Sequence, residues 1–187
     1  MEDGGKIPLL QQEEKKNGHG PVLWKMGAAV FLLDQGSKWA AISAIGNGEE
    51  KTVIEGFFKF VHWHNTGAAW SIMQNQNTLL MAISAIAFLG LIFYRSQFDV
   101  GTQRGRIALS LLCGGILGNL ADRLIHGHVV DFIRFYLKTR GQQQEVGFPA
   151  FNVADTAICV GVGLMFYSTW KAAKHGAELP GAPTQAR

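Results

Sequence analysis

The sequence predicts an all-α membrane protein: a four-transmembrane-helix bundle with a small extramembrane β-sheet on the outer face. The 187-residue chain has 48% hydrophobic but only 17% charged residues, whereas soluble domains carry roughly 25% charged residues. Four apolar segments follow one another, and a strand-like stretch separates the first two. The length corresponds to one domain.

The four apolar segments cover residues 22–45, 78–94, 107–124 and 151–170. At about 1.5 Å per residue the first is roughly 36 Å long, enough to cross a bilayer. Polar residues interrupt the first, third and fourth segments. The second contains no charged residue and gives the clearest membrane signal.

The ends of the chain differ in composition from the middle. Residues 1–21 are polar and predict a disordered N-terminal tail, and residues 176–187 predict a flexible C-terminal tail. A single membrane domain, 22–175, lies between them. The net charge is only +3 and no basic stripe is present, so nucleic acid is not an expected partner. Membrane lipids are expected partners.

Lys and Arg residues indicate the orientation, because cytoplasmic loops are enriched in them. With a cytoplasmic N-terminus, ten of the 17 lie inside, several of them in the short stretch 95–106. Both termini are then cytoplasmic, and the connections 46–77 and 125–150 lie outside. Residues 51–65 alternate in the manner of strands, with glycines at the turns, and predict a small sheet on the outer membrane surface.

Charged side chains inside apolar segments need a reason, since each costs about 2.5–3.5 kcal/mol on insertion scales. Asp34 and Lys38 are four residues apart and can pair on one helical face. Both a structural ion pair and a direct chemical role are open for them. For Asp122 and Arg123, at the end of the third segment, the simplest interpretation is snorkelling toward the interface.

Asp131 and Asp155 fit a different interpretation. Asp131 follows the third segment in an apolar stretch, and Asp155 lies one turn into the fourth segment, on the same side of the membrane. The polar loop between them can fold back and bring the carboxylates together. Two adjacent carboxylates do not easily both ionise, so one retains a proton. An aspartic protease uses such a pair, with one carboxylate activating water and the other polarising the scissile carbonyl.

Two His-x-His pairs, His62/His64 and His126/His128, raise the question of a metal site. Rings on one face of an interfacial strand are the simpler interpretation, so no metal or cofactor is expected. The steps Gly114-x-x-x-Gly118 and Ala157-x-x-x-Gly161 predict close helix packing.

Five motifs in order resemble those of the bacterial lipoprotein signal peptidases (signal peptidase II), over residues 22–172. They are Asp34-Gln-Gly-Ser-Lys38, Asn65-Thr-Gly-Ala-Ala-Trp-Ser71, Gly114-Gly-Ile-Leu-Gly-Asn119-Leu-Ala-Asp122-Arg123, Val130-Asp131-Phe132 and Phe151-Asn152-Val-Ala-Asp155. One such motif is weak evidence, but five in the same order are specific.

The resemblance implies an intramembrane aspartic endopeptidase of the bacterial cytoplasmic (inner) membrane. It implies that the substrate is a prolipoprotein cleaved before its diacylglyceryl-modified cysteine, and that globomycin-type peptide inhibitors bind. Asp131 and Asp155 match the catalytic pair. The matching polar residues around the site are Asn65, Gly67, Asn119, Arg123, Asn152, Asp34, Lys38 and Asp122.

Two features depart from the family pattern: the long polar N-terminal tail and an extended stretch at residues 136–148. Two other functions also remain open. A small proton-coupled membrane transporter would use Asp34, Asp122 and Asp155 as a relay, and a membrane scaffold would need no paired acids. For Asn65 and Arg123, substrate binding and bracing of the outer loops are both possible roles.

Overall fold

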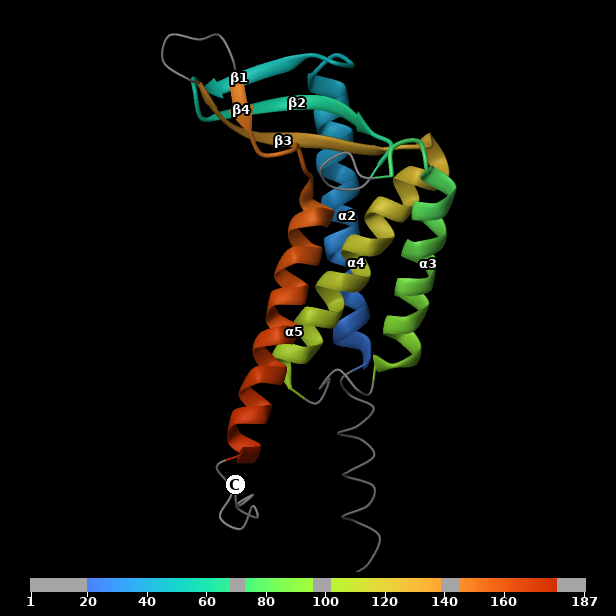
Figure 1. The fold of residues 1–187 in the computed structure, drawn as a ribbon. Coiled ribbons are helices and arrows are strands. Elements are labelled where there is room, and N and C mark those ends of the chain that lie inside the picture. The colour runs from blue at the N-terminus through green and yellow to red at the C-terminus, as the bar shows by residue number, and fades with distance from the viewer. Residues whose placement is uncertain (1–19, 68–72, 96–101, 139–144, 178–187) are drawn as a thin grey trace, which may run out of the picture.

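The computed structural model describes residues 20–67, 73–95, 102–138 and 145–177, and in them a helix bundle carries a β-sheet at one end (Figure 1). The described helices are α2 (Gly20–Ala44), α3 (Asn77–Phe93), α4 (Gln103–His126) and α5 (Val153–Ala177). They match the four predicted helical segments to within a few residues at most boundaries. The tails expected at 1–21 and 176–187 lie almost entirely outside the described residues.

Helix α4 lies at the centre of the bundle and contacts the other three helices. Its glycines make this possible. A Cβ added at Gly114 would lie 2.5 Å from the backbone oxygen of Gly27 in α2, and one at Gly118 would collide with the Asp34 carboxylate. The small-residue step in α4 therefore permits close packing, as predicted.

Local signals also fix the two ends of α4. The Thr102 hydroxyl accepts a hydrogen bond from the Gly105 N–H at 3.1 Å, which caps the N-terminus. At the other end Gly127 adopts a left-handed conformation, with φ of 75°, and its N–H donates to the Arg123 carbonyl. This glycine turn directs the chain from the helix into the sheet.

The described sheet has four antiparallel strands in the order β1 (Glu50–Ile54), β2 (Phe58–Asn65), β3 (Val129–Lys138) and β4 (Glu145–Gly147). The strands expected within 51–65 are present as β1 and β2. Strands β3 and β4 occupy a region that was expected to be an outer loop. Strand β3 has ten residues and pairs with β2, which lies about 70 residues earlier in the sequence. Short-range sequence patterns do not show such pairing.

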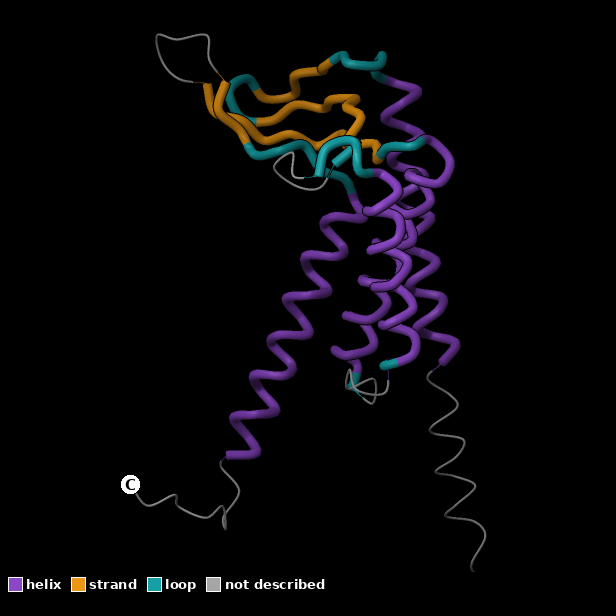
Figure 2. The backbone as a smooth tube through the Cα atoms, turned by 45° about the vertical axis from the view of Figure 1, so that its right-hand side comes forward, coloured by secondary structure: helices purple, strands orange, loops and turns teal. Residues whose placement is uncertain are grey.

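Two described helices are long and apolar enough to cross a membrane, namely α4 and the part of α5 from Val153 to Lys171. Helix α3, expected to give the clearest membrane signal, has only 17 residues and is not one of the two. The helices run in broadly similar directions away from the sheet (Figure 2). Apolar helices with a sheet at one end are thus the coarse architecture.

Candidate active site

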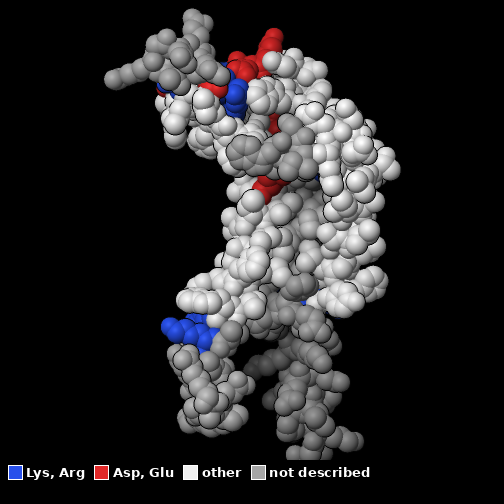
Figure 3. Space-filling view, viewed as in Figure 1, with Lys and Arg blue, Asp and Glu red and all other residues white. Residues whose placement is uncertain are grey.

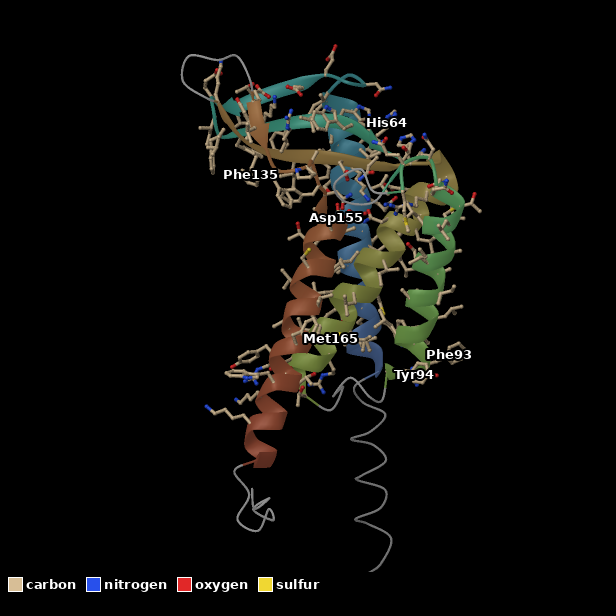
Figure 4. All side chains as sticks on the ribbon, viewed as in Figure 1. His64, Phe93, Tyr94, Phe135, Asp155 and Met165 are labelled. Atoms are coloured by element: carbon tan, nitrogen blue, oxygen red, sulfur yellow. The ribbon has the colours of Figure 1, made fainter. Side chains whose placement is uncertain are left out.

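The two carboxylates of interest meet where the sheet joins the bundle. Asp131 lies on β3 and is 3% exposed, whereas Asp155 is half-buried in the first turn of α5. Figure 4 places Asp155 at the sheet end of α5. Reciprocal backbone hydrogen bonds between Ile133 and Phe151, at 2.9 and 3.0 Å, hold the start of α5 against β3. The chain therefore returns to the same place at Asp155, 24 positions after Asp131.

Asn152 positions Asp155 through a capping box. The Asn152 side-chain oxygen accepts the Asp155 N–H at 3.0 Å, and the Asp155 carboxylate accepts the Asn152 N–H at 3.2 Å. This reciprocal arrangement at the first turn starts the helix and satisfies two otherwise unpaired donors. Asp155 thus lies in the first turn of α5, which begins two residues later than expected.

The same asparagine also reaches Asp131. Its fully buried side chain donates to the Asp131 carboxylate at 2.8 Å, and Asn65 donates to the other Asp131 oxygen at 2.9 Å. Burial, together with the nearby negative charge of Asp155, raises the pKa of Asp131 to about 7, while the two amide donors oppose this rise. Asp131 is therefore half-protonated near neutral pH.

A second group of charges lies next to this pair. The Lys38 ammonium lies 2.8 Å from Asp34 and 2.9 Å from Asp122, and all three side chains are almost fully buried. The structural ion pair expected for Asp34 and Lys38 is present, with Asp122 as a third member. Asp34 also accepts the Ala154 N–H at 2.8 Å, which links α2 to the start of α5.

Asn119 connects the two groups. Its amide nitrogen donates to Asp155 at 2.7 Å, while its oxygen accepts from Lys38 at 3.0 Å and from Asn152 at 3.2 Å. The amide therefore separates the ammonium of Lys38 from the carboxylate of Asp155. Among the described residues, no Lys or Arg nitrogen lies within 4 Å of Asp131 or Asp155.

The interpretation of Asp122 and Arg123 as snorkelling residues is wrong, because both are buried. Asp122 accepts the Val130 N–H at 3.1 Å and so fixes the start of β3. Arg123 donates to the backbone oxygens of Asn119 and Gly67, at 3.3 and 3.2 Å. The end of α4 faces the protein interior here because the sheet covers it.

Gly67 and Asn65 form one compact turn at the end of β2. The Asn65 side-chain oxygen accepts the Gly67 N–H at 2.9 Å while its nitrogen holds Asp131. Arg123 donates to the Gly67 carbonyl, so hydrogen bonds join Asn65, Gly67 and Arg123 in one group. The Arg123 Nε is buried and has no hydrogen-bond partner among the described residues, an arrangement that is rare in proteins.

The four histidines lie close together where β2 meets the end of α4. The rings of His64 and His128 stack with centroids 3.8 Å apart, so their nitrogens do not converge on one point. Within the described ranges no group of three or more His, Cys, Asp or Glu side chains is arranged to hold an ion. The expectation of strand histidines holds for His62 and His64, whereas His126 is the last residue of α4.

Two residues of this region were not predicted. The Gln35 amide donates to Asp122 at 2.9 Å and to Asp34 at 3.2 Å, completing the ion group. Asn77 begins α3 and donates to the Arg123 carbonyl at 3.3 Å. Gln35 follows Asp34 directly in the motif Asp34-Gln-Gly-Ser-Lys38, so its position was an available signal for this contact. Nothing in the local sequence around Asn77 indicates its contact.

The arrangement suits acid–base chemistry on a substrate that approaches from the side. Acidic side chains are visible in the hollow between the sheet and the helices (Figure 3). Two carboxylates that share one asparagine can hold one proton between them. Such a pair can take a proton from water and donate another to a carbonyl oxygen.

The chain is similar to known proteins over most of its length. Residues 26–171 match the family model described as signal peptidase (SPase) II. A lipoprotein signal peptidase from Neisseria meningitidis serogroup C is 40% identical over 147 residues, covering 75% of this chain and 84% of that protein. One from Symbiobacterium thermophilum is 38% identical over 141 residues, covering 75% and 89%.

Solved structures show the same fold. A bacterial membrane enzyme determined by the in meso method at 2.3 Å resolution superposes with a TM-score of 0.74 and 27% identity, covering 88% of this chain and 96% of that chain. A second, at 1.9 Å resolution, gives a TM-score of 0.67 and 29% identity, with 80% and 93% covered. With a family match over most of its length and relatives near 40% identity, this chain belongs to the signal peptidase II family.

Proposed function

We propose that Asp131 and Asp155 are the catalytic pair of this lipoprotein signal peptidase. As a member of the family, the chain removes signal peptides from prolipoproteins. One observation carries the assignment of the pair. Both carboxylates are held by amide donors and joined through Asn152, and in the described residues neither has a cation within salt-bridge distance.

In this proposal Asp131 carries the shared proton near neutral pH, and Asp155 is ionised. Asp155 takes a proton from the attacking water, while the protonated Asp131 donates a hydrogen bond to the scissile carbonyl oxygen. When the tetrahedral intermediate collapses, a proton passes to the leaving amine. No step calls for a metal ion, since the carboxylates activate the water.

The remaining polar residues hold the two catalytic carboxylates in place or bind the substrate. Asn65, Asn119 and Asn152 hold the carboxylates, and the unpaired Nε of Arg123 is suited to donate to a substrate carbonyl. Gly67 allows the substrate backbone to approach closely. The substrate class proposed is a prolipoprotein cleaved before its diacylglyceryl-modified cysteine, and globomycin-type peptides should compete for the same site.

We further propose that all four helices cross the bacterial inner membrane, with both termini cytoplasmic and the site near the outer face. The Lys and Arg distribution supports this orientation. A C-terminal reporter that is active only in the periplasm would contradict it. A transporter would carry ionisable groups along the bilayer, whereas the carboxylates of the described helices, Asp34, Asp122 and Asp155, gather toward the sheet end.

The test is a gel-shift cleavage assay on a lipid-modified prolipoprotein. Asp131→Asn and Asp155→Asn should each lower the rate by about 10²–10⁴-fold, because an amide cannot exchange the required proton. Their thermal unfolding midpoints in detergent should stay near wild type. Glu55→Gln, at an exposed carboxylate, is the control and should keep full activity. Turnover near wild type in either Asp variant would overturn the pair, and inhibition by a chelator would point to a metal enzyme.

A further inference from the structure

Four histidine rings gather beside the active site. His62 and His64 lie on β2, His126 is the last residue of α4, and His128 directly precedes β3. The centroids of the two β2 rings are 5.2 Å apart, and those of His126 and His128 are 6.0 Å apart. Figure 4 shows His64 at the same end of the helix bundle as Asp155. The chemistry proposed for the carboxylates uses none of these rings.

Two of the four rings, those of His64 and His128, form a stacked pair. Their centroids are 3.8 Å apart and their planes are inclined by 26°. Two positive charges at this distance repel each other strongly, and the repulsion grows where protein replaces water. His64 is exposed and His128 is half-buried, so the solvent can supply protons to the pair. The stack is therefore compatible with neutral rings and not with two charged ones.

The surroundings favour the neutral form of the stacked pair. Burial, followed by the charges of the neighbouring histidines, lowers the pKa of His64 and of His128 from the ordinary value of 6.5. The neighbours are His62 on β2 and His126 on α4. At His128 a backbone hydrogen bond of His126 and the carboxylate of Asp122 oppose the shift. A separated ring binds a proton at higher pH than a stacked one, so acidification below about pH 6.5 works against the stack.

The stacked pair lies where β2 and β3 meet at the active site. His64 is paired with Val130 in the antiparallel ladder, and His128 is two residues before Val130. Asn65 follows His64 directly and donates to Asp131, which follows Val130, at 2.9 Å. The amide that holds Asp131 is thus one residue away from the stack.

Of the two strands, β3 is fixed more firmly at this point. The Val130 N–H donates to Asp122 at 3.1 Å, and the Val130 carbonyl accepts from Asn152 at 3.3 Å. On β2 the Nδ1 of His62 bonds the backbone carbonyl that follows α2, at 3.1 Å. Repulsion within the stacked pair would therefore displace the end of β2 beyond His62, and Asn65 is part of that end.

We propose that the stacked pair of His64 and His128 positions Asn65 on Asp131 in a pH-dependent manner. Neutral rings hold the end of β2 in place, and charging of both rings releases it. This inference rests on the proposed role of Asp131 in cleavage. Released, Asp131 loses one of its two amide donors, and the turn that Asn65 forms with Gly67 moves with it. Cleavage then declines on acidification by more than the carboxylates alone would cause.

The test compares a ring that titrates with one that does not. His128→Phe keeps an aromatic ring beside His64 but cannot take up a proton, and His64→Gln removes the other titrating ring. His126→Gln is the matched control, because it removes a histidine that lies 6.0 Å from His128 and outside the stack. The gel-shift assay on a lipid-modified prolipoprotein gives kcat/KM at about pH 7.5 and about pH 5.5. Thermal unfolding midpoints in detergent are measured under the same two conditions.

On acidification, wild type and His126→Gln should lose several-fold more of their kcat/KM than His128→Phe and His64→Gln lose. The unfolding midpoints of wild type and His126→Gln should also fall further. In an Asn65→Ala background, His128→Phe should not change the acid loss of activity, because the stacked pair acts through Asn65. The two stack variants serve as independent checks on each other's folding.

Equal acid losses of kcat/KM in wild type and in both stack variants would overturn the inference. It would also be overturned if the variants lose the pH dependence of the midpoint but keep the full acid loss of activity. The pair would then titrate without affecting the site. Turnover near wild type in Asp131→Asn would instead contradict the proposed function, and the midpoints would still show whether the stacked pair titrates.

Discussion

Two pairs of carboxylates lie side by side in this protein, and they differ in whether a cation is bound to them. Asp34 and Asp122 share the Lys38 ammonium, with both contacts shorter than 3 Å. Asp131 and Asp155 have amide donors instead, with Asn119 between Asp155 and Lys38. The first pair is compensated by a full charge, and the second only by dipoles.

The difference separates a structural role from a chemical one. The ion pairs with Lys38 tie the carboxylates of Asp34 and Asp122 into the helix packing. A carboxylate with only amide partners and a second negative charge nearby has a pKa near neutrality, as Asp131 does. The compensated pair joins α2, α4 and α5, and the uncompensated pair is available for proton transfer.

Removing the shared cation should have the largest effect on stability. Lys38→Met leaves two buried carboxylates without a cation, which costs about 3–5 kcal/mol in comparable buried pairs. The thermal unfolding midpoint in detergent should fall sharply. Lys138→Met removes an exposed partner of Glu55 and should leave the midpoint unchanged. Equal midpoints for both variants would show that the buried cation does not stabilise the bundle.

A smaller effect should follow from adding one methyl group beside the compensated pair. Gly118→Ala directs a Cβ into the Asp34 carboxylate, and such overpacking typically costs about 1–3 kcal/mol. Gly163→Ala in α5 is the matched control, because a Cβ there meets nothing within 4 Å. Gly118→Ala should unfold at a lower temperature and Gly163→Ala at or above the wild-type midpoint. The reverse order would contradict the packing at Gly118.

The pH dependence of cleavage should show the smallest change, and it tests the second pair. As pH rises through about 7, Asp131 loses its proton and the rate should fall. Asn65 donates to the ionised form and therefore lowers the pKa of Asp131. Asn65→Ala should move the alkaline limb of kcat/KM upward by about one to two pH units, since hydrogen bonds to charges contribute about 1.5–3 kcal/mol. An unchanged or downward-shifted limb would contradict this role. The limb reports an apparent value for the pair.

The sequence predicts the four helices and the strands near residues 51–65 because these patterns are local. It also predicts the Asp34–Lys38 contact, which follows from four-residue spacing on a helix. Strand β3 and the burial of Asp122 and Arg123 depend on pairing between distant segments, and no local pattern specifies that. The alternation of Arg134, Tyr136 and Lys138 with apolar residues was a usable signal for β3. The contact of Asn77 with α4 had no such signal in the sequence.

The central claim is that Asp131 and Asp155 hold one proton between them at neutral pH. Infrared difference spectroscopy of the detergent-solubilised enzyme measures protonated carboxyl groups directly through their carbonyl stretch. A band assigned to a buried protonated carboxyl should persist to about pH 7. It should be absent from Asp131→Asn and remain in Asp34→Asn. A spectrum in which every such band titrates below pH 5, or in which the band survives in Asp131→Asn, would contradict the account.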